Sequence, residues 1–317
     1  MNLAQISKLG DRGQLLMASF LNVQPILRVA DFKLDASTHF VTAEKSVHTG
    51  SAARAIGSAA QRDQQSVNPV GRNLAAYERE ISIDDIYRYD KNVGMASAGL
   101  RLIVDRKLKA LASKIASEVV ADMFLGTDAD NRMLGISNFV KDADAAGQTA
   151  KLGYTTDELA AMNVQAALQL NTEDSQDAFV ELLDKELNNV PNANAIVVNP
   201  NLKARINRIA RRIGAAGESR DTFGLPVDTF NGVPLIAVPT SAIPQTESDG
   251  ANADCTSLYI LRFEEDLGTS FSTNSGFKFD DFENSEEEPA GISRLGFYLN
   301  LTVEQQNSLR RVSRIRL

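Results

Sequence analysis

The sequence is poor in the residues on which many active sites depend. Its 317 residues include two histidines (His39 and His48), one cysteine and no tryptophan. The single cysteine, Cys255, cannot form an intrachain disulfide and cannot by itself hold a structural zinc. The shortage of histidine also disfavours most zinc-dependent and histidine-based mechanisms.

Long apolar runs and a surplus of basic residues are lacking as well. No segment approaches the roughly 20 apolar residues of a membrane-spanning helix, and the first residues lack the pattern of a signal peptide. The chain has 33 basic and 41 acidic residues, a formal net charge of −8, which argues against a surface that binds nucleic acid or an anionic membrane throughout. We expect a soluble protein of mixed helices and strands, with about two compact units at roughly 150 residues each.

The sequence also lacks the common catalytic motifs. It contains no Walker loop, dinucleotide-binding glycine fingerprint, HExxH or G-x-S-x-G. Cys255 follows Asp254, an acidic setting that disfavours a thiolate, and we expect an inert residue near the start of a strand. We predict that the protein is not an enzyme and has no catalytic residue, no metal and no cofactor.

The clearest predicted element is a long helix. Apolar residues recur at spacings of three and four from Leu100 to Val119, which predicts a helix over Met95–Leu125. At 1.5 Å per residue it would be about 46 Å long, several times the usual length, and it should act as a structural beam. Gly126 follows its end and suits a left-handed cap.

The segment before this helix predicts extended structure. Residues 1–37 contain short apolar groups without long helical periodicity, which is typical of an arm. Strand formers from Phe32 to Glu44, a polar stretch over His48–Ser66 and the alternating strand Tyr77–Asp84 predict a long hairpin. A loop of this length is expected to find its contacts on another molecule, although a disordered surface loop is the alternative.

The segment after the long helix alternates predicted helices and strands. Thr155 and Glu158 match a capping box and predict a helix that runs through Leu168. Ala195–Val198 predicts a short buried strand, and the turn that follows it leads into a helix with an arginine-rich face. The stretch Glu264–Glu288 holds nine acidic residues and one basic one, so it accounts for the whole net charge.

The order of these elements resembles that of the tailed-bacteriophage major capsid proteins with the Hong Kong 97 fold. The resemblance covers about Phe20 to Leu317 and depends on order and spacing, because none of its short motifs is specific alone. The motifs are Gly126-Thr127 with Gly135-Ile136, Ala195–Leu202, Thr229–Leu235 and Arg294–Val303.

The resemblance implies an α+β fold with five segments. They are an N-terminal arm (1–37), an E-loop hairpin (38–85), a peripheral or P domain (86–150) with a spine helix (95–125), an axial or A domain (151–279), and returning P-domain strands with the C-terminus (280–317). It implies a major capsid protein that self-assembles into the icosahedral head shell around the double-stranded DNA genome of a tailed bacteriophage.

The same resemblance implies the partners. We expect a homo-oligomer of pentamers and hexamers, a separate scaffolding protein, a portal and, as an option, a decoration protein. The enclosed DNA would be held loosely without sequence-specific binding, and no membrane would take part. The protein would be located in the virion after assembly in the host bacterial cytoplasm.

Charged residues are the expected contacts between subunits. We predict that the acidic stretch over 264–288 meets arginines of the helix at 201–213 or of the C-terminus on a neighbouring copy. Plain solvation and contact with nucleic acid are the alternatives. The predicted interface residues are Arg54, Arg62, Arg72, Arg205, Arg208, Arg212, Glu264, Glu265, Asp280 and Asp281.

Two other functions remain open. An encapsulin, the shell protein of a bacterial nanocompartment, is expected to share this fold but usually has a helix in place of the extended N-terminal arm, so the predicted arm favours a phage capsid. A soluble enzyme with an unrecognised site is the alternative of a different class.

Overall fold

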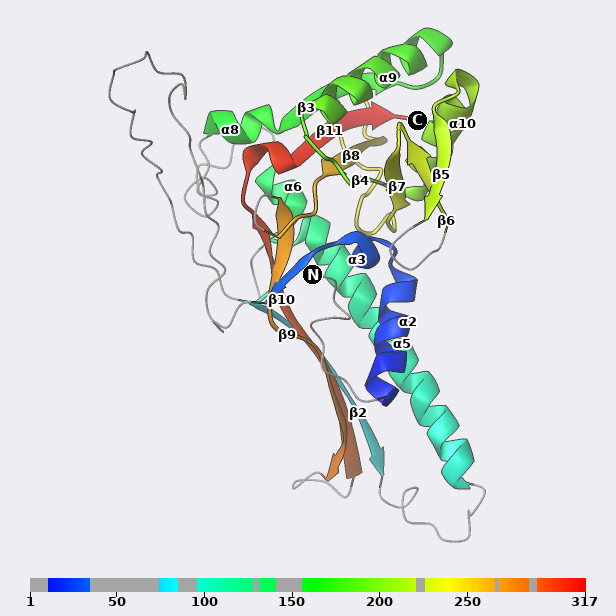
Figure 1. Ribbon diagram of the computed structural model, residues 1–317, viewed down its shortest axis with the longest axis vertical. Helices are drawn as coiled ribbons and strands as arrows, with labels where there is room; N and C mark the ends of the chain where they lie inside the picture. The colour runs from blue at the N-terminus through cyan, green and yellow to red at the C-terminus, as the bar shows by residue number, and fades with distance from the viewer. Residues whose placement is uncertain are drawn as a thin grey trace, which may run out of the picture.

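The structure of the protein is a computed structural model that describes residues 11–34, 74–84, 96–127, 131–140, 156–220, 226–265, 268–284 and 290–317. It contains two β-sheets that lie one above the other in an elongated molecule (Figure 1). Most of the predicted hairpin, including Arg54, Arg62 and Arg72, lies outside these residues.

The lower sheet is long and narrow and has four strands in the order β1-β9-β10-β2. Its strands are β1 (Phe32–Leu34), β2 (Ala75–Asp84), β9 (Thr269–Asn284) and β10 (Ala290–Val303). β2 pairs antiparallel with β10 from Ala75 opposite Leu299 to Asp84 opposite Ala290. The strand predicted over Tyr77–Asp84 is therefore confirmed, and it joins a sheet whose other long strands come from the C-terminal part of the chain.

The upper sheet has seven strands in the order β3-β11-β8-β4-β7-β6-β5. Its strands are β3 (Asn163–Gln169), β4 (Ala195–Val198), β5 (Ala216–Arg220), β6 (Pro226–Phe230), β7 (Val233–Ala237), β8 (Cys255–Leu261) and β11 (Leu309–Arg316). β4 and β8 are buried along their whole length, as expected for central strands covered on both faces. The predicted strand Ala195–Val198 is confirmed.

The two strands of the last segment lie in different sheets. Of the segment 280–317, expected to hold returning P-domain strands and the C-terminus, β10 lies in the four-stranded sheet with β2. β11, however, enters the seven-stranded sheet between β3 and β8. Its apolar residues Val312 and Ile315 are buried against the core of that sheet, which explains why the end of the chain belongs there.

The long helix is confirmed as α5 (Ala96–Leu125), with 30 residues. It runs beside the four-stranded sheet and reaches the seven-stranded sheet at its upper end (Figure 1). Leu108, Ile115 and Val119 are fully buried in the lower core, and the Phe124 ring lies 5.1 Å from the Tyr259 ring of β8. The helix therefore connects the two sheets through one continuous apolar core.

Residues 11–34 correct the prediction of a loose arm. They form α2 (Asp11–Val23), α3 (Ile26–Val29) and β1, and α2 packs along α5. Phe20 is fully buried, with its ring 5.3 Å from that of Phe277 and 5.4 Å from that of Phe297. The buried residues of α2 are Leu16, Met17, Phe20 and Leu21, a stripe of little more than one helical turn, which is too short to stand out as periodicity.

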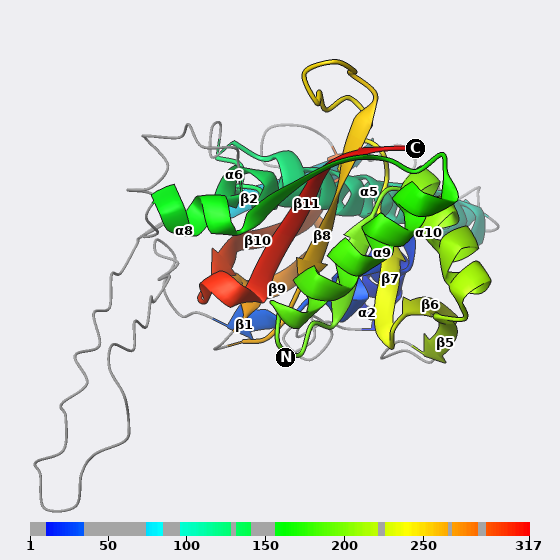
Figure 2. The ribbon, with the colours of Figure 1, turned by 90° about the horizontal axis from the view of Figure 1, so that it is seen from above.

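Two helices cover one face of the seven-stranded sheet (Figure 2). They are α9 (Glu173–Asn188) and α10 (Pro200–Ile213). Asn199 caps α10: its side chain accepts a hydrogen bond of 2.8 Å from the N–H of Leu202, and Gly214 ends the helix in the left-handed conformation at φ 76°. The cap and the glycine explain why the arginine-rich helix begins and ends at these residues.

The prediction of a helix that runs through Leu168 is wrong. A short helix, α8 (Thr156–Ala161), is followed by the strand β3, which pairs in parallel with β11. Val164, Ala166 and Leu168 alternate with more exposed residues along β3. The same residues therefore also fit the two-residue period of a strand. The partner strand lies far away in the sequence, and only tertiary pairing decides between the two periods.

The turn after α5 explains two glycines of the predicted motif. A Cβ atom on Gly126 would lie 2.0 Å from the carbonyl oxygen of Met133, and one on Gly135 would lie 2.6 Å from the Gly126 nitrogen. Gly135 donates a backbone hydrogen bond of 2.8 Å to Gly126, and the Asn138 side chain of α6 (Ile136–Phe139) donates to the same oxygen. Gly126 is not among the described glycines with positive φ, so close backbone approach is the reason for glycine here, and the predicted left-handed cap is wrong.

Candidate functional site

The described residues contain no group of three or more His, Cys, Asp or Glu side chains that could hold a metal ion. Cys255 is buried at the start of β8, as expected from the sequence. Burial and the nearby carboxylates of Asp249 and Asp254 raise the pKa of its thiol. Both histidines lie outside the residues that the structure covers, and none of the described helices is long and apolar enough to cross a membrane.

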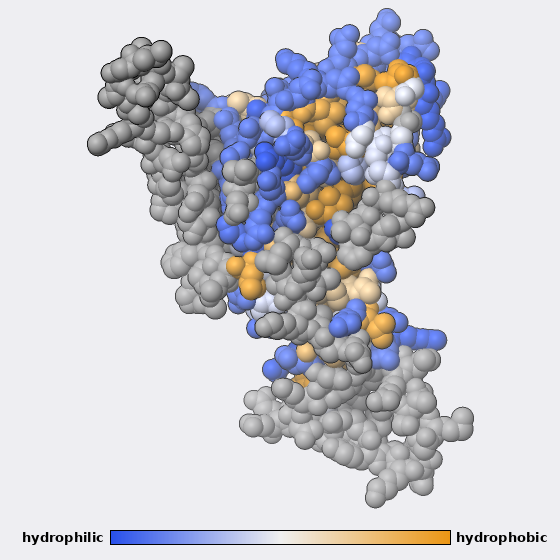
Figure 3. All heavy atoms as spheres, viewed as in Figure 1, coloured by the Kyte–Doolittle hydropathy of each residue, from blue (hydrophilic) through white to orange (hydrophobic). Residues whose placement is uncertain are grey.

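The most distinctive charged surface lies on α9 and α10. α9 carries six acidic residues and one lysine, whereas α10 carries five basic residues and no acidic one. The end of the molecule that bears them is mostly hydrophilic on the face drawn in Figure 3. Beneath this charge, apolar residues of both helices, including Phe179, Leu183 and Ile206, pack into the core of the seven-stranded sheet.

Some of this charge is paired within the chain. Arg212 forms ion pairs with Asp177 and, at 3.6 Å, with Glu173, so the end of α10 is tied to the beginning of α9. Lys203 lies 2.9 Å from Asp228 of β6, and its hydrogen bond to this carboxylate contributes most to lowering the pKa of Asp228. These ion pairs join α10 to α9 and to β6.

The predicted interface residues are spread over three places. On α10, Arg205 donates to the carbonyl oxygen of Leu170, Arg208 is exposed, and Arg212 is paired as above. Between the two sheets, Glu264 is ion-paired with Arg262 and Glu265 is half-buried.

On the four-stranded sheet, Asp280 and Asp281 lie on β9, with Asp280 opposite Arg294 of β10. The described structure therefore does not bring the acidic residues of β9 onto the same surface as the arginines of α10 within one chain, and a contact between copies stays a prediction.

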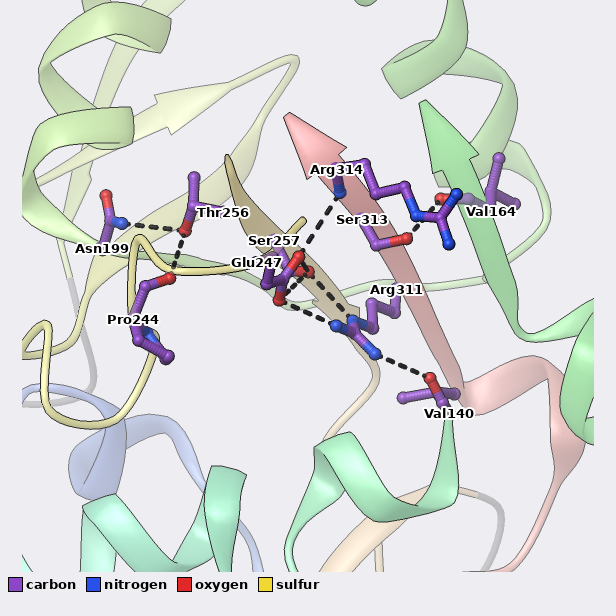
Figure 4. A network of polar contacts seen from close by, with 10 residues as sticks. All are labelled: Val140, Val164, Asn199, Pro244, Glu247, Thr256, Ser257, Arg311, Ser313 and Arg314. Carbon is purple, nitrogen blue, oxygen red and sulfur yellow. Dashed lines mark hydrogen bonds and ion pairs between the residues drawn. The ribbon is translucent and has the colours of Figure 1, made fainter. Parts of the chain in front are cut away.

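A polar network around Arg311, a residue that the sequence alone did not single out, joins the segment after α6 to the seven-stranded sheet (Figure 4). Arg311 of β11 donates to Glu247 at 2.8 Å, to Ser257 at 2.9 Å and to the carbonyl oxygen of Val140 at 3.0 Å. Its guanidinium lies 6.0 Å from the centre of the Tyr259 ring. Because Val140 follows α6 whereas Ser257 and Arg311 belong to the upper sheet, this arginine fastens the end of the α5–α6 unit to that sheet.

Glu247 completes the network. Its carboxylate accepts hydrogen bonds from the Ser257 hydroxyl at 2.6 and 2.7 Å and from the backbone N–H of Arg314 at 3.4 Å. The Arg311 and Glu247 side chains are 13% and 19% exposed. A charge pair that is largely withdrawn from water and satisfied by several hydrogen bonds is costly to break on one side only.

The other C-terminal arginines also have partners in the same chain. Arg316 lies 3.1 Å from Asp254, and Arg310 lies 3.9 Å from the buried Glu186 of α9. Burial lowers the pKa of the Arg310 guanidinium, while Glu186 acts in the opposite direction. The sequence gives no clear strand signal here, because Leu309, Val312 and Ile315 recur every three residues rather than every two. The pairing of β11 accommodates this spacing with a register shift between Val312 and Ile315.

Comparison with known proteins identifies the fold. No family model matches the sequence, and no curated protein matches it. Among solved structures, the chain is similar to the holo-SrpI encapsulin complex from Synechococcus elongatus PCC 7942, with 15% identity and a TM-score of 0.56 over 98% of this chain and 91% of the other.

Two capsids give similar values. The capsid of a native GTA particle is 14% identical with a TM-score of 0.54 over 98% of this chain and 92% of the other, and the capsid of cyanophage A-1(L) is 11% identical with a TM-score of 0.54 over 93% of both chains. The chain therefore has the Hong Kong 97-type fold expected from the sequence.

Proposed function

We propose that this protein is a shell subunit: a major capsid protein whose copies self-assemble into the icosahedral head of a tailed bacteriophage around double-stranded DNA. The observation that carries the proposal is the match over 93–98% of the chain to subunits of two capsids and an encapsulin. These neighbours have in common that they form closed particles, and at these identities their likeness supports the fold directly and the function by analogy.

The shape of the molecule supports the same proposal. A long helix beside a narrow sheet and a broader upper sheet give an elongated subunit with many different surfaces (Figure 1). A subunit of this shape can bury a moderate surface area against each of several neighbours. In an assembly with closed symmetry, many weak contacts together stabilise the shell. Pentamers and hexamers, a separate scaffolding protein, a portal and an optional decoration protein belong to this proposal, as do assembly in the host bacterial cytoplasm and a final place in the virion.

Charge contacts between subunits remain part of the proposal. We infer that exposed charges of α10, including Arg208, and of β9, including Asp280, contact neighbouring copies. A lining with few basic residues would hold the genome loosely and without reading its sequence, because binding to DNA depends mainly on basic contacts with phosphates.

Electron microscopy of the purified protein tests the proposal. We expect closed particles of uniform size above a threshold protein concentration, with the protein alone or with its scaffolding partner. Protein that stays monomeric at high concentration in both preparations would contradict a shell function, and turnover of a substrate by that monomer would favour the soluble enzyme.

An encapsulin-type nanocompartment shell is the second candidate, and one observation favours it. The N-terminal segment is helical and packed on α5, which is the feature expected of an encapsulin rather than of a phage capsid with an extended arm. The contents of particles purified from the native host distinguish the two: packaged double-stranded DNA supports the phage capsid, and a protein cargo without DNA supports the encapsulin.

A further inference from the structure

The outer face of α9 carries acidic side chains that no other described residue pairs with. Asp174, Ala178 and Glu181 lie at positions i, i+4 and i+7, so they share one face of the helix, and all three are exposed. Within the described part of the chain, no side-chain hydrogen bond or ion pair involves Asp174 or Glu181. The same helix buries Phe179 and Leu183 on its opposite side.

α10 presents a basic face built with the same spacing. Ala204, Arg208 and Arg211 also lie at i, i+4 and i+7 and are exposed. Lys203 and Asn207 use one side of the helix to contact Asp228 of β6. Over the residues that the structure covers, no side-chain hydrogen bond or ion pair involves Arg208 or Arg211, and the charge of Arg211 acts on Asp228 only as a minor contribution to lowering its pKa.

From this pair of faces we propose that copies of the chain associate head to tail, with the acidic face of α9 in one copy against the basic face of α10 in the next. The inference rests on the proposed shell function and specifies one contact between neighbouring subunits. The acidic face consists of Asp174, Ala178 and Glu181, and the basic face of Ala204, Arg208 and Arg211. Two acidic side chains then oppose two basic ones. Ala178 lies between the two acidic residues of α9, and Ala204 lies one turn before the two arginines of α10, so each face has a small residue that lets the helices approach.

A second copy is the partner that these faces fit best. Each copy carries one face of each sign, and the pairing satisfies both without a different protein. In Figure 1, α9 lies along the top of the molecule and α10 at its right edge, so one copy can use its two faces on two different neighbours. Head-to-tail contacts of this kind close into rings when the rotation between copies allows it, and complementary charges at their rims set the register and the rate of association.

Charge reversal tests the contact. The variants are Arg208→Glu/Arg211→Glu, Asp174→Arg/Glu181→Arg, and the chain that carries all four substitutions. We expect each double variant to raise the protein concentration at half-assembly by about tenfold or more, because like charges then face each other. The fourfold variant should return to within about threefold of the original chain, since its faces are complementary again. Light scattering and analytical ultracentrifugation measure assembly, and circular dichroism melting verifies that each variant is folded.

A matched control uses Lys107 and Lys109, two exposed basic residues on α5. Lys107→Glu/Lys109→Glu combined with Asp174→Arg/Glu181→Arg should not restore assembly, because these lysines do not face α9 of a neighbour. Restoration by this control would overturn the inference.

The remaining outcomes separate this inference from the proposed function. If the original chain forms shells and folded double variants form them at the same concentration, the contact is wrong and the shell function stands. The contact is also wrong if the folded fourfold variant assembles no better than the double variants, or if the original chain stops at a two-fold dimer built on these faces. If the original chain never assembles with or without its scaffolding partner, the proposed function fails first.

Discussion

At the scale of single residues, the turn after α5 depends on the absence of two side chains. Gly126 and Gly135 lie where backbone segments approach so closely that a Cβ atom would collide with main-chain atoms. Main-chain atoms held by hydrogen bonds cannot move aside cheaply, unlike the end of a flexible side chain. This turn joins the long helix to α6 and so controls where the two sheets meet.

Alanine at either glycine should therefore destabilise the fold. We expect Gly126→Ala and Gly135→Ala to lower the free energy of unfolding by about 3 kcal/mol, measured by chemical denaturation. The control is Gly296→Ala, whose Cβ would meet the flexible Glu78 side chain at 3.3 Å, and it should cost less than about 1 kcal/mol. Equal stability of Gly126→Ala and the unmodified chain would show that the turn relaxes without strain.

The pair Arg311 and Glu247 is the second feature at this scale. We expect Arg311→Met to lower the free energy of unfolding by about 3 kcal/mol, because it leaves the Glu247 carboxylate largely buried without its cation. The double variant Arg311→Met/Glu247→Gln should be more stable than the sum of the two single losses predicts, and a double-mutant cycle measures the difference.

Arg316 provides the matched control for this pair. Its ion pair with Asp254 is more exposed, with side chains 32% and 53% accessible. Arg316→Met should therefore cost less than about 1 kcal/mol. An equally small effect at Arg311 would mean that the network in Figure 4 contributes little to holding the segment after α6 on the seven-stranded sheet.

At the scale of elements, α2 belongs to the core of its own chain. Its buried stripe packs on α5, and Phe20 contacts aromatic rings of β9 and β10. An element that fills the space between a helix and a sheet contributes to folding before any neighbour is present.

Substitutions on the two faces of α2 should therefore separate folding from association. Phe20→Ala should lower the free energy of unfolding of the unassembled subunit by about 3–5 kcal/mol, as seen for large aromatic residues in cores. Leu15→Ala on the outer face, where the side chain is 62% exposed, should leave the unfolding of the subunit within about 0.5 kcal/mol. If Phe20→Ala changed only assembly and not the stability of the subunit, the packing of α2 on its own chain would not be important for folding.

At the scale of the whole molecule, the predicted E-loop hairpin connects the fold to the proposed shell. The predicted hairpin (38–85) follows β1 and includes β2 at its end, and these are the two outer strands of the four-stranded sheet. Both strands are anchored by pairing, β1 with β9 and β2 with β10. The sheet therefore does not depend on the segment between them for its own pairing.

Deletion of residues 48–68 should then leave a folded subunit that does not assemble. We expect a melting temperature within a few degrees of the original chain, because the described strands of both sheets and their pairing lie outside residues 48–68. Negative-stain microscopy should find no closed shells at concentrations at which the original chain forms them. Normal shells would contradict a role of the hairpin between subunits, and an unfolded product would mean that the segment supports its own chain.

Much of the architecture could be predicted from the sequence because it depends on local patterns of residues. The periodicity of α5, the strand Ala195–Val198, the turn that follows this strand and the alternation in β2 each concern neighbouring residues and survive in any fold that contains them. Their order was sufficient to suggest the Hong Kong 97-type fold. The charge of α10 was also visible, because a helix that buries Leu202, Ile206 and Ile209 on one face leaves its basic residues around the rest of the helix.

Tertiary structure alone decided the rest, because it depends on residues far apart in the chain. β3 is a strand only because β11 offers it a parallel partner, and residues 11–34 are core only because α5 and β9 provide the opposite surface. The arginines of β11 find their carboxylates on Glu186, Glu247 and Asp254, none of which is near them in sequence. Burial and ion pairing depend on which residues the fold brings into contact. A pattern in the sequence indicates that a residue can be buried or paired, but it does not identify the partner.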